Sequence, residues 1–292
     1  MYKIVFLISC YLAIHLVGYS QLPSTQIYAF NIRSVDDSVT FSNAKYLTGF
    51  NDAGYNSQPS FINNNELLIT SNYFDPNQTD IIRLHLAKET LTRVTATSQG
   101  EYSPTLMMDR RHFSVIKETM GGDINQVLWG YPLSQANSGN LLIENEYRVG
   151  YHCWLSGSEV ATFLVDEPHQ LVIFDLLEDS KMKIADNPGR SLLNVDGKLI
   201  YIDKSNKDNW NINSYDPSLN QIQVIAPALP NSEDMVFMEP SYILMGSKSK
   251  LYRLDLRDPE SWKEMADLQT YGIKNINRLA QKGNRLIIVN AK

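Results

Sequence analysis

The chain has 292 residues, of which 43% are hydrophobic and 20% are charged, and its formal net charge at pH 7 is −6. This composition is ordinary for a globular protein that buries an apolar core. A nucleic-acid-binding protein needs a clustered basic surface, and the sequence contains no basic run, so we expect no nucleic-acid partner.

The first segment, residues 1–20, is predicted to be a secretory signal peptide. Lys3 provides the positive start, residues 4–17 form an almost uncharged apolar stretch, and Gly18 and Ser20 are small residues just before a cut after position 20. The apolar stretch of about 14 residues is shorter than the ~20 that a membrane-spanning helix needs. We therefore expect an exported protein, either periplasmic or secreted.

The cysteines add one alternative to this interpretation. The segment Leu7-Ile8-Ser9-Cys10 resembles a lipobox, which would make Cys10 a lipidated first residue, although the apolar run continues well beyond it. Lipid anchoring through Cys10 is kept as the secondary alternative. After removal of the segment, Cys153 is the only cysteine, which rules out an intramolecular disulfide. No second long apolar stretch follows, so no membrane span is predicted in the mature chain.

A strand pattern recurs along the chain with a period of roughly 40–47 residues, the size of a four-stranded propeller blade. In each copy, two inner strands joined by a polar turn precede a third apolar strand and a fourth strand of alternating character. The third and fourth strands are predicted in pairs at Asp80–Leu86 and Thr90–Thr95, Gln126–Leu133 and Leu141–Ile143, Gln170–Leu176 and Lys181–Ala185, Trp210–Asp216 and Gln221–Ile225, and Lys250–Leu256 and Trp262–Ala266.

The two ends of the repeat region complement each other. Residues Gln26–Ile32 and Ala44–Thr48 have the pattern of third and fourth strands without a first and second. Residues Ile276–Leu279 and Arg285–Val289 have the pattern of first and second strands without a third. Joining them closes a ring and removes exposed edges. The sequence thus predicts an all-β, six-bladed β-propeller of four-stranded blades over residues 21–292, a single domain whose last blade is closed by the N- and C-terminal strands.

The inner strands carry a resemblance to a known family. Pro59-x-Phe61 with Glu66–Ser71, and Asp196–Tyr201, resemble degenerate copies of the TolB-like (WD-repeat-like) propeller repeat, which reads Pro-x-Trp-Ser-Pro-Asp-Gly-Lys before an apolar strand. The likeness covers nearly the whole mature chain by period, and its turn is retained as Asp196-Gly197-Lys198. The resemblance implies a six-bladed propeller, without a counterpart of the separate N-terminal domain of TolB itself.

Candidate binding residues follow from the predicted fold. Ligands of propellers bind at the mouth of the central channel, where loops lead into the innermost strands. These loops would ring one opening with Tyr55, Tyr102, Tyr151, His152, Arg190, Asp234 and Lys274. Aromatic faces with a few charges suit a peptide or a small polar ligand. The alternative is that these residues only pack and seal the channel.

The sequence gives little support for cofactor or metal chemistry. A catalytic thiol needs a base within reach, whereas the neighbours His152 and Cys153 point to opposite faces of a strand. The histidines His85, His112, His152 and His169 lie at blade-scale separations without metal-ligand spacing. We therefore expect no metal and no cofactor.

The predicted function is that of an exported, non-catalytic module that binds a protein or peptide partner in the cell envelope. The alternative is a metal-dependent hydrolase of the lactonase or glycan-acting type. Its channel could offer ligands such as Asn56, Glu101, Asp234 and Asn275. No Gly-x-Ser-x-Gly motif occurs and no hydrolase domain follows in this sequence, so we do not expect a peptidase of the propeller-plus-hydrolase type.

Overall fold

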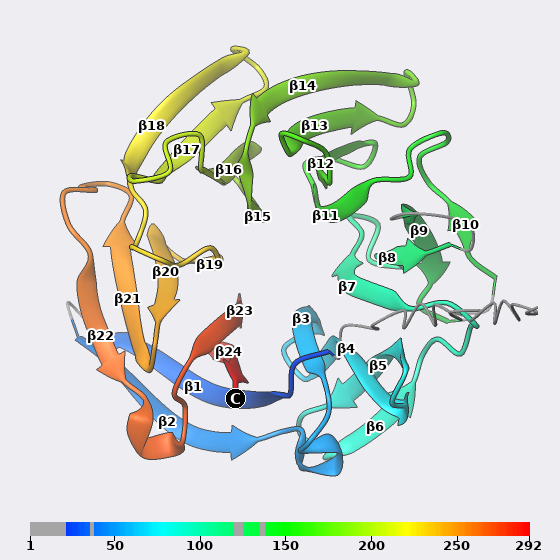
Figure 1. The fold of residues 1–292 in the computed structure, drawn as a ribbon. Coiled ribbons are helices and arrows are strands. Elements are labelled where there is room, and N and C mark those ends of the chain that lie inside the picture. The colour runs from blue at the N-terminus through cyan, green and yellow to red at the C-terminus, as the bar shows by residue number, and fades with distance from the viewer. Residues whose placement is uncertain (1–21, 36–37, 120–124, 135–137) are drawn as a thin grey trace, which may run out of the picture.

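The computed structural model describes residues 22–35, 38–119, 125–134 and 138–292. In this part of the chain, six four-stranded antiparallel sheets stand around a common axis like the blades of a propeller (Figure 1). The predicted all-β, six-bladed architecture is confirmed. The expected signal peptide and Cys10 lie outside the described residues. No helix among the described residues is long and apolar enough to cross a membrane.

Five blades are each built from four consecutive strands. Blade 1 contains β3 (Asn56–Asn63), β4 (Glu66–Asp75), β5 (Gln78–His85) and β6 (Thr90–Arg93). Blade 2 contains β7 (Glu101–Leu106), β8 (His112–Glu118), β9 (Gln126–Pro132) and β10 (Asn140–Leu141), and blade 3 contains β11 (Val149–Trp154), β12 (Glu159–Leu164), β13 (Gln170–Asp175) and β14 (Ser180–Asp186). Blade 4 contains β15 (Pro188–Val195), β16 (Lys198–Asp203), β17 (Asn211–Asp216) and β18 (Gln221–Pro227), and blade 5 contains β19 (Met235–Met238), β20 (Tyr242–Ser247), β21 (Lys250–Asp255) and β22 (Lys263–Asp267).

The sixth blade joins the two ends of the described chain. Its strand order is β2 (Ser38–Tyr46), β1 (Thr25–Val35), β24 (Arg285–Ala291) and β23 (Ile276–Lys282), with β1 antiparallel to β24. Two short 3-10 turns, η1 (Gly49–Asn51) and η2 (Gln269–Tyr271), lie next to this blade in the chain. Since β1 is a third strand and β24 a second strand, the predicted closure by the N- and C-terminal strands is confirmed.

The core consists of apolar layers between neighbouring blades. Each of the six interfaces contains one cluster of buried apolar side chains. In β4, Leu67 and Ile69 face the closing blade, whereas Leu68, between them, faces blade 2. A strand buried on both faces has no need of polar alternation. This is why the second strands contain continuous runs such as Leu67-Leu68-Ile69.

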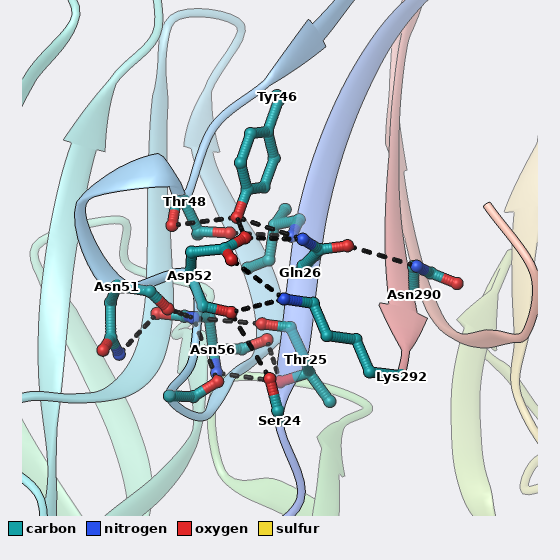
Figure 2. A network of polar contacts seen from close by, with 12 residues as sticks. Ser24, Thr25, Gln26, Tyr46, Thr48, Asn51, Asp52, Asn56, Asn290 and Lys292 are labelled. Carbon is teal, nitrogen blue, oxygen red and sulfur yellow. Dashed lines mark hydrogen bonds and ion pairs between the residues drawn. The ribbon is translucent and has the colours of Figure 1, made fainter. Parts of the chain in front are cut away.

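Polar contacts hold the closing blade against blade 1 (Figure 2). The Thr25 hydroxyl donates to the carbonyl of Asn56 at 2.8 Å, and the Asn56 side chain donates to the carbonyls of Thr25 and Asn51 at 3.0 and 2.9 Å. Nearby, Lys292 Nζ lies 3.0 Å from the Asp52 carboxylate. These contacts connect both ends of the described chain to the entrance of β3.

The innermost strands bend where they pass the axis. The register shifts within the pairings of β3, β7, β11, β15 and β23 with their second strands. Gln58 and Ser103, within two of these irregular stretches, have left-handed φ values of 53° and 52° although neither is glycine. A β-bulge re-aims the side chains beside it. In this fold the bulges lie next to the channel.

Candidate functional site in the central channel

A cavity of about 420 Å³ lies on the axis of the ring. Its walls come from the innermost part of all six blades, around which Figure 1 shows β3, β7, β11, β15, β19 and β23 nearest the centre. The lining segments are 58–61, 103–105, 151–153, 190–193, 234–237 and 278–282. Because every blade contributes a short segment, the cavity exists only once the ring is closed.

A buried ion pair forms one wall of the cavity. Arg278 Nη1 lies 3.2 Å from Asp234 Oδ1, and each side chain is only 12% exposed. The backbone N–H of Leu279 donates to the other Asp234 oxygen at 2.6 Å. The Arg278 guanidinium also lies 5.0 Å from the centre of the Tyr151 ring, within the range of a cation–π contact. Residues from blades 3 and 5 and the closing blade therefore meet at one point.

Burial and charge act against each other in this pair. Burial raises the pKa of Asp234 above its ordinary value, and the positive charges of Arg278 and Arg190 oppose that rise. Burial acts to lower the pKa of Arg278, but the Asp234 carboxylate, followed by Tyr151 and Tyr55, raises it above its ordinary value. Arg278 is accordingly a permanent cation in the channel wall.

Arg190 approaches the same region from β15. Its Nη2 donates to the backbone carbonyl and to the side-chain oxygen of Asn277, at 2.8 and 2.7 Å. Its Nε lies 4.0 Å from Glu233 Oε2, which is beyond hydrogen-bond distance, and Lys204 contacts the other oxygen of that carboxylate. In the described part of the chain, this buried Nε has no hydrogen-bond acceptor.

Two further tyrosines predicted for the site are not part of the cavity lining. Burial raises the pKa of Tyr55, and the charges that act on its phenol include those of Arg278 and Arg190. Tyr102, in β7, packs against the apolar cluster between blades 2 and 3, and burial raises its pKa to about 12. The structure thus brings Tyr151, Arg190 and Asp234 together in the lining, without Tyr55 and Tyr102.

His152 and Cys153 also line the cavity, but as uncharged groups. His152 Nε2 lies 2.7 Å from the hydroxyl of Ser114 in blade 2, and burial lowers the pKa of the imidazole to about 3. Burial raises the pKa of the Cys153 thiol to about 12, so the thiolate is disfavoured at neutral pH. Both groups are uncharged in the folded protein. His152 joins blades 2 and 3 by a hydrogen bond.

The remaining sequence-predicted residues lie elsewhere. Lys274 is exposed and is not part of the cavity lining, and its backbone N–H donates to Asn290 Oδ1 at 2.9 Å. The side chains of Asn56 and Glu101 belong to separate buried hydrogen-bond networks, with Thr25 and with Tyr131 respectively. Within residues 22–35, 38–119, 125–134 and 138–292, no group of three or more His, Cys, Asp and Glu side chains is arranged to hold a metal ion.

Sequence reasoning missed Arg278 and Asn277, and it placed the binding residues on loops. Tyr102, Tyr151 and Arg190 instead lie inside β7, β11 and β15. In a regular strand Arg278 would share the face of Ile276, so the alternation gave no signal that Arg278 lines the cavity. The bulge between Ile276 and Arg278 was not visible in the sequence.

Comparisons with known proteins show the fold. No family model matches the sequence, and no curated protein matches it. Among solved structures, the chain is similar to TolB from Acinetobacter baumannii, with 12% identity and a TM-score of 0.61 over 84% of this chain and 64% of that one. The chain therefore spans less than two thirds of the length of that protein.

Two further solved structures match over nearly their whole length. The putative TolB from Agrobacterium tumefaciens has 12% identity and a TM-score of 0.63, over 93% of this chain and 99% of that one. A chain of a nidogen/laminin complex has 10% identity and a TM-score of 0.63, over 91% of this chain and 98% of that one. Together with the closed ring of six four-stranded blades, these similarities show that the chain folds as a TolB-like six-bladed β-propeller.

Proposed function

We propose that this chain is an exported, non-catalytic propeller that binds a protein or peptide partner through its central channel. The observation that carries the proposal is the cavity of about 420 Å³, at which Arg190, Asp234, Arg278 and Tyr151 converge from four blades. Tyr55 and Tyr102, which precede two of the lining segments in the chain, are proposed to contribute to the same binding face.

The size of the cavity supports a short segment as the occupant. Small-molecule pockets have volumes of roughly 300–1,000 Å³, so this cavity holds a drug-sized ligand or a few residues of a peptide and is too small for a folded domain. A folded partner would therefore rest on the rim of the propeller and insert an extended segment or a side chain into the channel.

The comparisons are consistent with a binding role. One matched chain comes from a nidogen/laminin complex, in which two proteins are bound to each other. A propeller suits such a task because its blades hold the channel residues on strands, and rigid elements position binding groups better than loops do.

Export is proposed from the sequence of residues 1–20. N-terminal sequencing of the mature protein purified from its native cells should give a start at Gln21, and cell fractionation should find the protein outside the cytoplasm. A lipid-modified N-terminus at Cys10 would support the alternative anchor, and an intact Met1 in a cytoplasmic fraction would contradict export.

The channel assignment is tested by plugging the cavity. Thr105 lines the channel, and Thr105→Trp would fill it without altering the ion pair; the matched control is Thr92→Trp on the exposed strand β6. We expect a tagged wild-type protein and the control to capture the same identified envelope protein. The plugged variant should lose that protein, and so should a Tyr102→Ala/Arg190→Gln double variant.

The interaction must then be reconstituted from the purified propeller and the purified partner. Equal affinity of the wild type and Thr105→Trp would contradict channel binding. Metal analysis of the native protein provides a separate check. A stoichiometric divalent ion together with hydrolysis of a lactone or glycan substrate would instead support the enzyme alternative.

A further inference from the structure

The channel has a positive lining in a chain that is acidic as a whole. The charged residues around the cavity are three cations, Arg190, Arg278 and Lys282, and one anion, Asp234. His152 is part of the same lining and stays neutral, because burial lowers its pKa to about 3. The whole chain, by contrast, has a net charge of −6. Excess positive charge in a partly dehydrated cavity attracts an anionic group more strongly than it would in water.

The two arginines, Arg278 and Arg190, differ in how many of their N–H groups have a partner. Arg278 contacts Asp234 at 3.2 Å and stacks over Tyr151. Arg190 donates hydrogen bonds only through Nη2, to Asn277; its buried Nε lies 4.0 Å from Glu233, within ion-pair range, but has no hydrogen-bond acceptor in the described part of the chain. A buried donor without a hydrogen-bond partner is unfavourable and calls for an explanation in a native structure.

The neighbouring acid does not supply the missing acceptor. Glu233 Oε2 lies 4.0 Å from Arg190 Nε, and its carboxylate is engaged by Lys204, whose ammonium also lies 4.6 Å from the centre of the Trp210 ring. The Asp234 carboxylate accepts hydrogen bonds from Arg278 and from the Leu279 backbone. Each nearby acid therefore has a closer cation than Arg190.

Arg190 can also be reached from two sides. It lines the central cavity and, together with Asp234, a second cavity of about 270 Å³ formed by residues 231–234, 246–248 and 275–277. A ligand in the channel can therefore approach the guanidinium while the rest of its chain continues towards the surface between blade 5 and the closing blade.

We propose that the channel recognises a carboxylate of the bound peptide, which pairs with the Arg190 guanidinium. This inference rests on the proposed binding function and specifies its ligand. The carboxylate is either a C-terminus or an Asp or Glu side chain, since both present the same charge and acceptor geometry. An arginine–carboxylate contact is a charge-assisted hydrogen bond, which is stronger than a neutral one.

The proposal is tested first on the wild-type protein, with small probes and without a known partner. The arginine Nε–Hε resonances of ¹⁵N-labelled protein are followed by NMR during titration at constant ionic strength. The probes are N-acetylglycine as a C-terminus, N-acetylglutamic acid α-amide as a side chain, N-acetylglycinamide as the neutral control, and inorganic phosphate. We expect a saturable shift of the Arg190 resonance with at least one carboxylate and none with the neutral amide.

Variants then locate the site. Arg190→Gln removes the donor and one charge, and Arg111→Gln, in an exposed turn, removes the same charge elsewhere. Carboxylate affinity should fall by roughly tenfold or more in Arg190→Gln and remain unchanged in Arg111→Gln. Thermal unfolding of each variant checks that the fold is kept.

The possible failures are distinguishable. No saturable shift in the wild type, a shift of equal size with the neutral amide, or binding of phosphate alone would overturn the carboxylate proposal. If Thr105→Trp abolishes capture of the protein partner while Arg190→Gln binds it normally, the channel function stands and the carboxylate contact falls. If Thr105→Trp captures the partner as well as the wild type does, the channel function itself falls.

Discussion

At the scale of single residues, the channel depends on charged groups that the fold buries together. Asp234 and Arg278 are nearly enclosed, and each provides the partner that makes burial of the other tolerable. A buried ion pair adds little net stability compared with apolar residues, but removing one member leaves an uncompensated charge. The fold therefore depends on both members of the pair being present.

Removal of Arg278 alone should cost more stability than removal of both charges of the pair. We expect Arg278→Met to lower the free energy of unfolding by about 3 kcal/mol or more, because Asp234 keeps its burial and loses its nearest cation. The double variant Asp234→Asn/Arg278→Met should recover part of that loss. Urea unfolding of the three proteins at pH 7 measures both effects, and equal losses in the single and double variants would contradict the buried-charge explanation.

His152 should give the protein a defined sensitivity to acid. Its pKa is about 3 in the folded protein and ~6.5 in an unfolded chain, so between these values the unfolded state binds one more proton. This contribution to stability is present above pH 6.5 and is lost as the pH falls, at about 1.4 kcal/mol per pH unit. The loss ends near the folded pKa.

The measurement is urea unfolding at several pH values between 7 and 4, for the wild type and for His152→Gln. We expect the variant to be less stable at pH 7, because it alters the contact with Ser114, and its stability to fall less steeply with acid. Other groups, such as Glu101, whose pKa burial raises, titrate in both proteins and cancel in the comparison. Parallel stability curves would contradict the assignment to His152.

At the scale of elements, the hairpins fix the blades. The turn between β15 and β16 has two residues, Asp196 and Gly197, with φ values of 51° and 80°, and the flanking Val195 and Lys198 are paired. Two central residues with positive φ are typical of a type I′ turn, whose twist matches that of antiparallel strands. The Asn194 side chain accepts from the Gly197 N–H at 3.0 Å and closes the turn.

Gly197 is expected to be required for its backbone conformation alone. An added Cβ would meet open space, so Gly197→Ala changes only the strain of the left-handed φ and should destabilise the protein by about 1–2 kcal/mol. Gly157 is the matched control, since its Cβ position is also open and its φ is not left-handed. Thermal unfolding should show a clear loss for Gly197→Ala and little change for Gly157→Ala; equal effects would contradict the argument.

At the scale of the whole molecule, stability depends on closing the ring. β1 pairs with β24 from Thr25↔Ala291 to Asn31↔Arg285, so the pairing joins residues from opposite ends of the chain. The contacts of Asn56 then attach this blade to blade 1 (Figure 2). Pairing of such distant segments is slow to form, but it leaves neither β1 nor β24 with an unpaired edge.

Asn56 should be the most sensitive polar position of the closure. Asn56→Ala removes the donors to Thr25 and Asn51 and the acceptor of the Ser71 hydroxyl, all of which stay buried or partly buried. We expect a loss of about 2–3 kcal/mol. Asn209→Ala, at an exposed site, should stay within about 0.5 kcal/mol of the wild type in the same urea titration. Equal stability of the two variants would contradict a role for Asn56 in closure.

The sequence by itself determined the architecture of this protein. Local patterns were sufficient: continuous apolar runs such as Leu67-Leu68-Ile69 for strands buried on both faces, and Asp196-Gly197 for a tight turn. The closing blade could be predicted as well, because the strand pattern missing at one end was present at the other. The strand pattern repeats once per blade, so one imperfect copy is corrected by the others.

Only the tertiary structure decided which side chains form the channel. A shift of one residue reverses the direction of every side chain on a strand, and the bulges in the inner strands introduce such shifts at unmarked positions. Arg278 therefore escaped prediction, and Lys274, four residues earlier, proved to be exposed away from the cavity. The pairing of Asp234 with Arg278 joins different blades, and no local pattern encodes a contact that exists only after the ring has closed.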